Sequence, residues 1–461
     1  MESQAAQEIA ALVAPLDGKD VLEITLEDAQ AVTEAAASAV AGAKSITRVV
    51  WSMECEDAAF ADVHDRFDLV LFSRVLTFAT EQQAKWLARK VLHWLRPEGV
   101  VTCRESCLQA PFPIPSTSAR TPSYREPSFY IGLLGTTVAD DQMRGFAYLD
   151  FVHCKSLDVY RKAAAHTHGE LVFTYKKVDQ PAEEEEINTR GRSASQEIDT
   201  FQNFLDNQQY SNASITRYEK IFGSGYVSTG GQVTTTEFVA RLDLKPGQRV
   251  LDVGCGIGGG DFYMANTFGV SVHGIDLSTN MVTRAIEQFS TQHVPRDGND
   301  VQFEICDATT TAFAPGTFDA IYSRDTILHI EDKRALFTKF FQWLKPGGKV
   351  LFSDYCCGDD KPPSDRFKAY VKKRGYVLFS PRQYGQLLED VGFTSVVAED
   401  RTDQFVAVLQ DELARTYEQK TAFIQDTSEA DFNDIVQGWE AKLTRCADGD
   451  QKWGLFLATK P

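Results

Sequence analysis

No apolar run in the 461-residue sequence approaches the ~18 residues that a transmembrane helix needs, so we expect no membrane insertion. The first stretch, MESQAAQEIAALVAPLDGKD, lacks the basic start and apolar core of a secretory signal. A formal net charge of -18 argues against a nucleic-acid partner, because a phosphate backbone requires a basic surface. We therefore expect a cytoplasmic protein with small-molecule partners. The sequence does not fix its oligomeric state and allows a monomer.

A CxxC pair with zinc spacing is also lacking among the nine cysteines. Cys356 and Cys357 are adjacent, and an odd number of cysteines is not typical of a disulfide framework. We expect buried, reduced thiols in the cytosol and no metal cofactor.

An apolar period is missing from residues 179–200, which contain four consecutive glutamates followed by Arg, Gly and Ser. This composition predicts a solvated linker, with docking or phosphorylation as a less favoured role. The predicted organisation is a domain at 1–178, the linker at 179–200 and a second domain at 201–461.

Two segments on either side of this linker resemble each other. Residues 67–107 and 318–356 share a Ser-Arg pair, a WLxPxG stretch and a cysteine, and the tryptophan-to-cysteine spacing is equal. Each predicts strand, helix, Pro-Gly turn and strand, so we interpret the pair as an internal duplication. Alternating strands and helices predict an α/β fold with a doubly wound, mostly parallel sheet. In the second half, strands are expected at 249–253, 271–275, 301–305, 318–322 and 348–353.

Gly254, Gly256 and Gly259 follow an apolar run in LDVGCGIGG, at the spacing of a nucleotide-binding loop. Glycines let the backbone approach a ligand, and the following helix offers free N–H groups. Asp276 ends the next predicted strand, where its carboxylate can accept hydrogen bonds from ribose hydroxyls. These features suit NAD and S-adenosylmethionine alike.

Further motifs favour S-adenosylmethionine. Asp252, two residues before the first glycine, can orient the loop and face a cationic methionine group, and Asp307 in CDATT can meet an adenine amino group. With HGIDLS and LKPGG, these motifs resemble the series found in class I S-adenosylmethionine-dependent methyltransferases. The resemblance implies tandem Rossmann-like methyltransferase domains, with S-adenosyl-L-methionine as donor and S-adenosyl-L-homocysteine as product. A dehydrogenase is the less favoured alternative.

The stretch FLDNQQYSNASITRYEKIFGSGYVSTGG at 204–231, with YSRDTILH, SDYC, FKAYVKKRGYVL and KWGLFLATK, resembles the phosphoethanolamine N-methyltransferases. The duplicated chain with one degraded half is similar to the nematode type whose active domain is C-terminal. The resemblance implies methylation of phospho-monomethylethanolamine and phospho-dimethylethanolamine to phosphocholine, in the phosphobase pathway of phosphatidylcholine synthesis.

The resemblance also implies the site residues. Catalysis is expected from Tyr210, Asp325 and His329. Cofactor contacts are expected from Val227, Ser228, Gly254, Gly256, Asp276, Leu277, Asp307, Ala308 and Arg324. Substrate contacts are expected from Gln209, Tyr218, Tyr355, Tyr370, Arg374, Tyr376 and Lys442. Arg324 has a counterpart, Arg74, in the first half, which leaves a structural role open for it.

These residue types fit the chemistry. Asp325 and His329 lie four apart and would share one face of a helix. His329 can remove the amine proton, Asp325 can fix the ring or touch the amine, and Tyr210 is expected to close over the substrate and bond to His329. Arg374 can grip phosphate with its planar fork. The alternatives are a capped helix with an incidental histidine and a solvated basic helix end.

The first half lacks the corresponding groups. VLEITLEDA replaces VLDVGCGIG, so that Leu26 and Glu27 put bulk and negative charge where backbone would meet the cofactor. Aligned on the Ser-Arg pair, the residues that replace the aspartate, histidine and first phosphate tyrosine are Val75, Ala79 and Ser106. A non-catalytic first half is therefore expected. For the whole chain, a regulatory binding module and a methyltransferase for protein or lipid headgroups remain alternatives.

Overall fold

The computed structural model describes residues 2–26, 43–53, 64–107, 122–135, 137–141, 145–161, 169–180, 202, 205–294 and 299–461. Glu27 and residues 181–200 of the expected linker lie outside the described residues. The chain divides into two compact units, residues 1–203 with 304–306, and residues 204–303 with 307–461.

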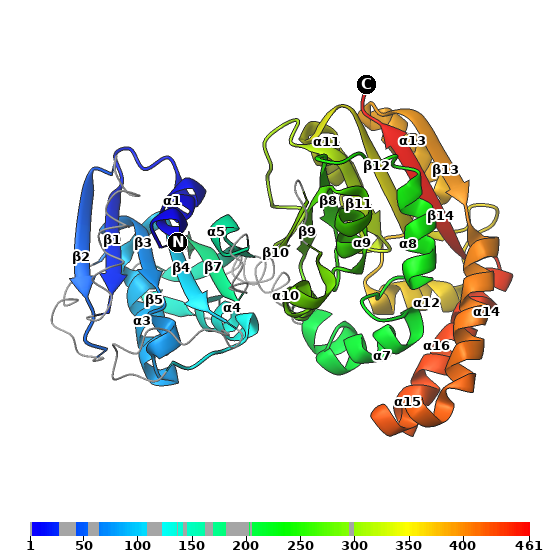
Figure 1. Cartoon of the computed structure of the whole chain (residues 1–461), viewed down its shortest axis with the longest axis horizontal. Coiled ribbons are helices and arrows are strands. Elements are labelled where there is room, and N and C mark those ends of the chain that lie inside the picture. The colour runs from blue at the N-terminus through cyan, green and yellow to red at the C-terminus, as the bar shows by residue number, and fades with distance from the viewer. Residues whose placement is uncertain are drawn as a thin grey trace. The chain divides into compact units, whose positions relative to one another are not determined.

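The second unit contains the predicted doubly wound sheet (Figure 1). The strand order is β10-β9-β8-β11-β12-β14-β13. Within it, β9, β8, β11 and β12 run parallel, whereas β14 is antiparallel to both of its neighbours. The strands are β8 (Arg249–Val253), β9 (Ser271–Asp276), β10 (Asp300–Ile305), β11 (Phe318–Arg324), β12 (Leu344–Cys357), β13 (Thr394–Asp400) and β14 (Gln451–Thr459). All five strands expected from the sequence are confirmed.

The LKPGG segment differs from its expected form, because it lies inside β12 rather than in a turn before that strand. Phe318 pairs with Leu344, but Ala320 pairs with Lys349, so β12 carries extra residues opposite one step of β11. Gly347, at φ 77°, lies in this irregularity. The Pro-Gly pair therefore forms a bulge within a long strand.

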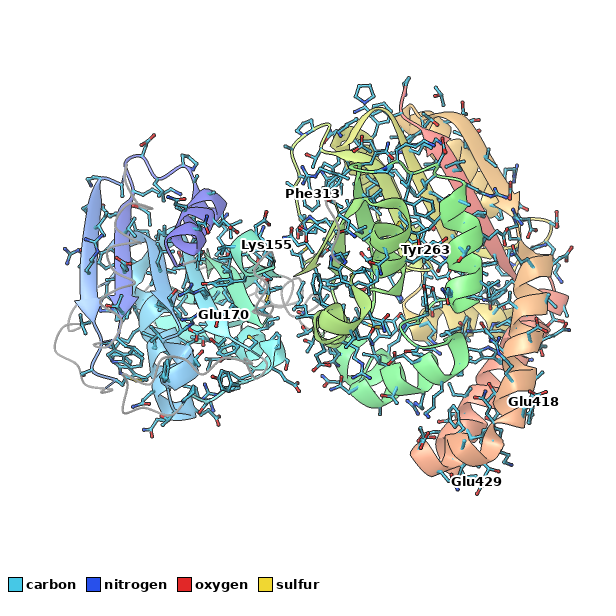
Figure 2. The ribbon with its side chains drawn as sticks, viewed as in Figure 1. Lys155, Glu170, Tyr263, Phe313, Glu418 and Glu429 are labelled. Atoms are coloured by element: carbon cyan, nitrogen blue, oxygen red, sulfur yellow. The ribbon has the colours of Figure 1, made fainter. Side chains whose placement is uncertain are left out.

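Helices surround this sheet, and five of them begin at a serine whose hydroxyl accepts a backbone N–H three residues later. The helices are α7 (Asn212–Phe222), α8 (Gly231–Ala240), α9 (Gly259–Phe268), α10 (Thr279–Gln292), α11 (Lys333–Trp343), α12 (Asp365–Arg374), α13 (Pro381–Val391), α14 (Thr402–Glu418), α15 (Lys420–Asp426) and α16 (Glu429–Ala447). Two short turns, the π-helix η4 (Leu205–Gln209) and the 3-10 helix η5 (Ile327–His329), carry predicted site residues. Figure 2 labels Glu418 and Glu429, where α14 ends and α16 begins.

The core of the second unit lies between the sheet and these helices. On α11, Leu336, Phe337 and Phe340 recur at helical spacing and are each at most 1% exposed. The Phe337 ring packs against Phe352 of β12, with ring centroids 5.1 Å apart. Burial of each such side chain contributes about 1.5–3 kcal/mol, which fixes α11 and the turn before it on the sheet.

The first unit has the same plan, with strand order β2-β1-β3-β4-β7-β6 and β5 paired to β6. Its β1, β2, β3 and β4 are parallel, and β7 is antiparallel to β4. Its elements are α1 (Glu2–Val13), β1 (Asp20–Thr25), β2 (Ser45–Val50), β3 (Phe67–Ser73), η3 (Leu76–Phe78), α3 (Glu81–Trp94), β4 (Leu95–Ser106), α4 (Pro127–Gly135), β5 (Val138–Asp141), β6 (Gly145–Ser156), α5 (Asp158–Arg161) and β7 (Glu170–Gln180). The last strand extends two residues into the segment expected as linker.

The two units share a register that corrects the alignment expected from the Ser-Arg pairs. Leu69 pairs with Val100 as Ala320 pairs with Lys349, after the same irregularity in both sheets. The strand pairing therefore matches Ser73 with Arg324.

One residue further on, Arg74 and Asp325 both adopt a left-handed backbone, with φ of 54° and 51°. Arg74 therefore takes the place of Asp325, and Phe78 that of His329; the expected pairings with Val75 and Ala79 are wrong by one residue. The Ser-Arg pairs misled the alignment because β3 has one residue more than β11 before its serine. Ser106 does correspond to Tyr355, as expected.

Membrane-spanning helices and metal-ligand clusters are both absent from the described residues. None of their helices is long and apolar enough to cross a membrane. Within the same residues, no group of three or more His, Cys, Asp or Glu side chains is arranged to hold a metal ion.

Candidate active site

The glycine loop joins β8 to α9 and needs glycine for two reasons. Gly254, Gly256 and Gly258 have φ of 80°, 55° and 85°, a conformation that other residues rarely adopt. A Cβ on Gly254 would lie 2.1 Å from the Thr326 hydroxyl, and one on Gly256 would lie 2.9 Å from a methyl group of Val227. The loop thus presents bare backbone at the N-terminus of α9, where N–H groups favour a polar ligand.

Asp276 ties this loop to the end of β9. Its two oxygens accept hydrogen bonds from the backbone N–H groups of Gly256 and Ser278, each at 2.9 Å. Burial raises the pKa of Asp276 to about 6, while these N–H groups favour the ionised form. The carboxylate is therefore fixed beside the glycine loop, where the sequence expects a ribose contact.

Asp252 lies below the loop and faces a second acid that sequence reasoning missed. Asp261, in the first turn of α9, is fully buried and interacts with Asp252. Burial raises the pKa of Asp252 to about 7 and that of Asp261 well above its ordinary value, so the two groups hold a proton between them at neutral pH. A Cβ on Gly274 would lie 2.6 Å from Asp261. The glycine in HGIDLS was therefore the one local sign in the sequence that a side chain packs against this strand.

Three further predicted cofactor residues follow the ends of neighbouring strands, whereas Val227 and Ser228 lie between α7 and α8. Asp307 and Ala308 follow β10, and Leu277 follows β9. The Asp307 carboxylate accepts the Thr309 N–H at 2.7 Å, which orients it at this edge. Carboxyl ends of parallel strands meet at one edge of the sheet, where α/β proteins bind ligands.

Arg324 uses its guanidinium inside the protein. It donates to the Ser353 hydroxyl at 2.8 Å, the Thr229 carbonyl at 2.8 Å and the Thr234 hydroxyl at 3.0 Å. The side chain is buried and stacks over Phe238 at 4.8 Å. These contacts give it the structural role that the sequence left open, because they join β11, β12 and α8.

Asp325 lies in a left-handed turn after β11, so the expectation that it shares one helix with His329 is wrong. One carboxylate oxygen accepts the Ser353 hydroxyl and the Trp453 indole N–H, both at 2.8 Å. The other is buried and has no hydrogen-bond partner among the described residues. A buried carboxylate oxygen without a donor is costly, which favours a ligand that supplies one.

His329 ends η5, with its ring against Tyr376 at a centroid distance of 5.1 Å. Burial, together with charge repulsion from Lys333 and Arg374, lowers the pKa of His329 to about 4. The imidazole is therefore neutral at physiological pH and can accept a proton. Tyr210 receives a hydrogen bond from Gln209 at 2.9 Å, and its expected bond to His329 stays a prediction.

The segment that carries Gln209 and Tyr210 is anchored by two residues that sequence reasoning missed. Asp206 accepts the Ser278 hydroxyl at 2.6 Å and lies at the start of α10. Asn280 donates to the carbonyls of Asp206 and Tyr210, at 2.8 and 2.9 Å. The sequence gave no sign of these contacts, because the residues that form them are about 70 positions apart in the chain.

The predicted phosphate residues gather around Arg374. α12 presents Tyr370 and Arg374, and Tyr376 follows after Gly375. Four tyrosines, at positions 210, 218, 370 and 376, lie close enough to influence the Arg374 pKa, which is raised by them against the opposing effect of burial. No acidic partner of Arg374 is found in the described part of the chain. The guanidinium is thus available to an anion.

Lys442 on α16 adds a second cation. Its ammonium donates to the Tyr355 hydroxyl at 3.4 Å and lies 4.0 Å from the centre of the Trp439 ring. Burial lowers its pKa to about 8, so the group gains from an anionic ligand. Tyr355 also meets the Thr229 hydroxyl at 3.3 Å. The phenols and the two cations are groups that can bind a phosphate, and their assignment as the phosphate site stays a prediction.

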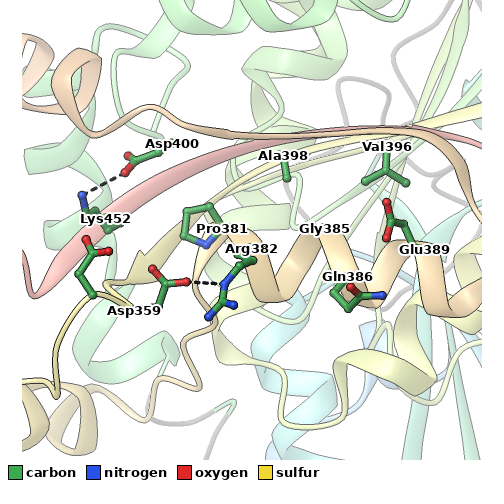
Figure 3. A pocket seen from close by; sticks show the side chains of 11 residues that line it. Asp359, Pro381, Arg382, Gly385, Gln386, Glu389, Val396, Ala398, Asp400 and Lys452 are labelled. Atoms are coloured by element: carbon green, nitrogen blue, oxygen red, sulfur yellow. Dashed lines mark hydrogen bonds and ion pairs between the residues drawn. The ribbon is translucent and has the colours of Figure 1, made fainter.

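A surface hollow beside α13, β13 and β14 contains none of the predicted site residues (Figure 3). Its two cations are paired with acids, Arg382 with Asp359 at 2.9 Å and Lys452 with Asp400 at 3.0 Å, and Asp360 and Glu389 add negative charge that does not suit a phosphate. The hollow therefore does not compete with the glycine loop as the candidate site.

The fold, the glycine loop and the acids at the strand ends define a class I S-adenosylmethionine-dependent methyltransferase. A family model described as "Methyltransferase domain" matches residues 232–399. The chain is 42% identical over 477 residues to phosphoethanolamine N-methyltransferase 1 of Arabidopsis thaliana, covering 100% of this chain and 92% of that protein. It is 38% identical over 259 residues to the Plasmodium falciparum phosphoethanolamine N-methyltransferase, covering 56% of this chain and 95% of that one.

A solved structure also matches the whole chain. Haemonchus contortus phosphoethanolamine N-methyltransferase 2, in complex with phosphomonomethylethanolamine and S-adenosylhomocysteine, superposes with a TM-score of 0.82 at 28% identity, covering 100% of this chain and 99% of that one. The chain belongs to the phosphoethanolamine N-methyltransferase family. The expected family is confirmed, whereas the plant relative is more similar in sequence than the nematode structure.

Proposed function

We propose that the second half transfers methyl groups from S-adenosylmethionine to phospho-monomethylethanolamine and phospho-dimethylethanolamine, giving phosphocholine. The observation that carries this proposal is the placement of Arg374 and Lys442 among tyrosines, close to Asp325 and His329. A phosphobase has a phosphate at one end and an amine at the other, and this site offers groups for both.

S-adenosylmethionine, when bound, supplies an electrophilic methyl group. The residues present fit it: the glycine loop leaves backbone bare, and Asp276 is fixed beside it with an ionised carboxylate favoured by two N–H groups. The residues that would hold the cofactor are Val227, Ser228, Gly254, Gly256, Asp276, Leu277, Asp307 and Ala308, with Arg324 supporting them from inside.

The phosphobase would be held at its phosphate by Arg374, Lys442 and Tyr355, with Tyr370, Tyr376, Tyr218 and Gln209 around it. Arg374 and Lys442 provide positive charge, and the phenols donate hydrogen bonds without adding charge. The ammonium group of the substrate must lose a proton before its nitrogen lone pair can attack the methyl group. Neutral His329 accepts that proton, and the unpaired Asp325 oxygen receives an N–H or an N-methyl group beside it.

The first half is proposed to be non-catalytic, the arrangement expected of the nematode type. It carries Arg74, Phe78 and Ser106 at the positions of Asp325, His329 and Tyr355. A cytosolic location is proposed as well, since none of the eight cysteines in the described ranges forms a disulfide.

The test is transfer of an isotope-labelled methyl group by the full chain to each of the three phosphobases. We expect turnover of the mono- and dimethyl compounds and poor turnover of phosphoethanolamine, because each added methyl contributes ~0.8 kcal/mol of apolar burial among the aromatic rings. Discrimination of ~10–200-fold is typical for one methyl group. Comparable kcat/KM for phosphoethanolamine and its monomethyl derivative would contradict the proposed selectivity.

A further inference from the structure

The 3-10 turn η5 is held by a buried lysine. Lys333, the first residue of α11, is 1% exposed, and its ammonium donates to the carbonyls of Ile327 and Ile330, both at 2.7 Å. These two carbonyls bracket His329. Buried lysines are rare unless their donors are satisfied, so the interaction is a specific feature of this turn.

A buried acid lies next to the same turn on the side of β12. Asp354 is fully buried near Leu328, and Tyr384 donates its hydroxyl to the carboxylate. Lys333 therefore holds the turn through carbonyls on both sides of His329, with Asp354 beside it. The backbone of His329 itself donates to the Thr326 carbonyl at 3.1 Å.

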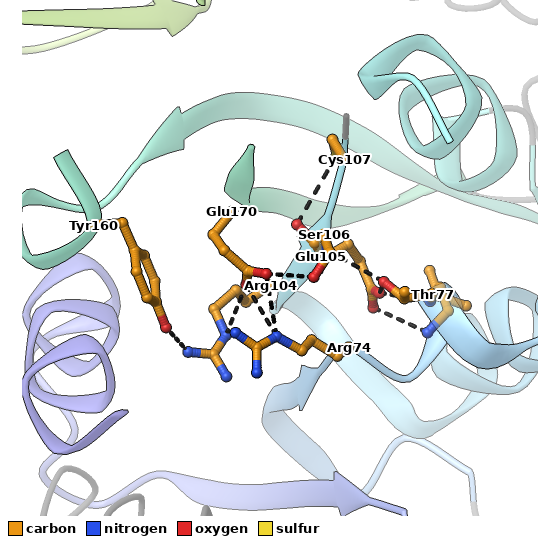
Figure 4. A network of polar contacts seen from close by, with 9 residues as sticks. Arg74, Thr77, Arg104, Glu105, Ser106, Cys107, Tyr160 and Glu170 are labelled. Atoms are coloured by element: carbon orange, nitrogen blue, oxygen red, sulfur yellow. Dashed lines mark hydrogen bonds and ion pairs between the residues drawn. The ribbon is translucent and has the colours of Figure 1, made fainter. Parts of the chain in front are cut away.

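The first half holds its corresponding turn in the same way with a different cation. Arg125 donates to the carbonyls of Leu76 and Ala79, at 2.7 and 2.6 Å. In the corrected register these carbonyls are the counterparts of those that Lys333 holds. Glu105, the counterpart of Asp354, accepts the Thr77 N–H at 2.7 Å (Figure 4).

The two cations do not correspond in sequence. The equal tryptophan-to-strand spacing places Ala84 of α3 where α11 has Lys333, and Arg125 comes from the segment before α4. Two different residues thus satisfy the same pair of carbonyls. This turn requires a cation on its carbonyls, whatever position in the chain supplies it.

In the second half the cation has a further effect, because the turn carries a histidine. Lys333 on α11 and Arg374 on α12 are the charged groups that act on His329, and Tyr376 packs against its ring. After burial, Lys333 is the largest cause of the lowered pKa of His329. In the first half the same position is Phe78, so the turn held by Arg125 carries no titrating ring.

We propose that Lys333 is a positioning residue for the N-methylation reaction: it fixes η5 through the Ile327 and Ile330 carbonyls and places its positive charge near the His329 imidazole. The inference rests on the proposed function, in which His329 takes the amine proton.

Kinetics of Lys333→Met and Lys333→Arg in the full chain test the positioning. We expect kcat for phospho-monomethylethanolamine to fall ~10–100-fold in Lys333→Met, since small displacements of a catalytic group have such effects, with KM changed less than kcat. Lys333→Arg restores kcat to within about threefold, because a guanidinium holds the same carbonyls in the first half. The matched control is Arg334→Met, which removes an exposed charge paired with Asp390 on the same helix and leaves kcat unchanged.

Titration of the His329 imidazole by NMR tests the electrostatic part without substrate, with His329→Gln used to assign the resonance. We expect His329 to titrate well below its ordinary value in the wild-type chain, and to move upward in Lys333→Met but not in Arg334→Met. An ordinary titration in the wild type, or equal kcat and titration in both methionine variants, would overturn the proposal.

Two further variants, Lys333→Gln and His329→Gln, distinguish a failure of this proposal from a failure of the proposed function. If Lys333→Met does not fold, Lys333→Gln retains N–H donors without charge; an unchanged His329 titration in that variant overturns the electrostatic role. Full activity of His329→Gln would refute the assignment of His329 as base, whereas the shift of its imidazole titration by Lys333 would still be measured independently.

Discussion

The same backbone position carries opposite charges in the two halves. In the second half, the Asp325 carboxylate accepts hydrogen bonds from Ser353 and Trp453 and keeps one oxygen without a donor. In the first half, Arg74 occupies this position and its guanidinium donates to Glu170 at 3.1 Å. Glu170 pairs with Ser106 in the first sheet as Trp453 pairs with Tyr355 in the second, so Glu170 and Trp453 correspond. The strand residue is therefore the acceptor in the first half and the donor in the second.

Polar groups of the first half therefore satisfy one another (Figure 4). The Ser106 hydroxyl donates to Glu170, and Arg104, at the position of Ser353, donates to the Tyr160 hydroxyl. Glu170 lies within 3.9 Å of Arg104 as well. The guanidinium of Arg74, which replaces Asp325, thus already has an acidic partner, whereas one oxygen of Asp325 lacks a donor among the described residues. The difference teaches that a lost site is closed by internal partners as well as by missing glycines.

The acid that precedes the glycine loop, Asp252, also has a first-half counterpart with an internal partner. Glu23 in β1 replaces Asp252, and its carboxylate is neutralised by Arg48 at 2.8 Å. Strand pairing places Arg48 where the second half has Gly274, the residue that makes room for Asp261. An ion pair in the first half thus replaces a proton-sharing acid pair in the second.

The largest expected loss of activity comes from replacing Asp325 by arginine, the residue type found at the corresponding position, Arg74, in the first half. Asp325→Arg places a third cation near Arg374 and Lys442 and removes a buried carboxylate oxygen that lacks a donor among the described residues. We expect kcat/KM for phospho-monomethylethanolamine to fall ~10³-fold, since a lost charged hydrogen bond and an added buried charge both oppose binding of the amine. Steady-state kinetics measure the loss.

The matched change in the first half is Arg74→Gln, which removes the charge from the corresponding position. Its kcat/KM should stay within about twofold of the wild-type value, because the proposed methyl transfer takes place in the second half. A folded Arg74→Gln variant with little activity would mean that the first half takes part in the reaction, and the comparison would fail.

A smaller effect is expected at the end of β9. The strand register places Val50 at the position of Asp276, so Asp276→Val imports the first-half residue. Loss of charged hydrogen bonds worth about 1.5–3 kcal/mol should weaken S-adenosylmethionine binding ~10–150-fold, without unfolding the protein. Calorimetry measures the affinity, and Val50→Ala is the control. Unchanged affinity of the Asp276→Val variant would remove Asp276 from the cofactor site.

The smallest expected effect is on stability, through His329, whose place in the first half is taken by the non-titrating Phe78. The His329 pKa of about 4 lies below the unfolded value of about 6.5, so the unfolded chain binds more protons between these pH values. The free energy of unfolding therefore rises with pH across this window, and the contribution of neutral His329 is lost as the pH falls toward 4.

Denaturant unfolding of wild type and His329→Gln checks this sign. Relative to the variant, the wild type should gain about 2 kcal/mol between pH 4 and pH 6.5, a value below the full pKa difference because the ring is partly exposed. Other buried acids titrate in both proteins and cancel in the difference. Parallel stability curves would show that His329 is not held neutral.

Much of this molecule was predictable from local patterns. The second-half strands, the glycine loop and the helix that carries Tyr370 and Arg374 each have a signal within a few residues. The duplication was visible too, because a tryptophan and a cysteine recur at fixed spacing.

The supporting contacts were not predictable, because they depend on hydrogen-bond register and on residues distant in the chain. The left-handed turn at Asp325 and its equivalence with Arg74 follow from one extra residue in β3, which shared letters conceal. Asp206, Asp261 and Lys333 look like ordinary helix-terminal charges in the sequence. Only the folded chain shows which backbone groups or acids they meet.

The anchoring of η4 on α10 has a thermodynamic consequence. Asp206 holds the start of the helix that follows Asp276, and the same short segment carries Gln209 and Tyr210. The candidate nucleotide and phosphobase sites therefore share one piece of structure. If a bound phosphobase changes the affinity for S-adenosylhomocysteine through this piece, bound S-adenosylhomocysteine must change the affinity for the phosphobase by the same factor.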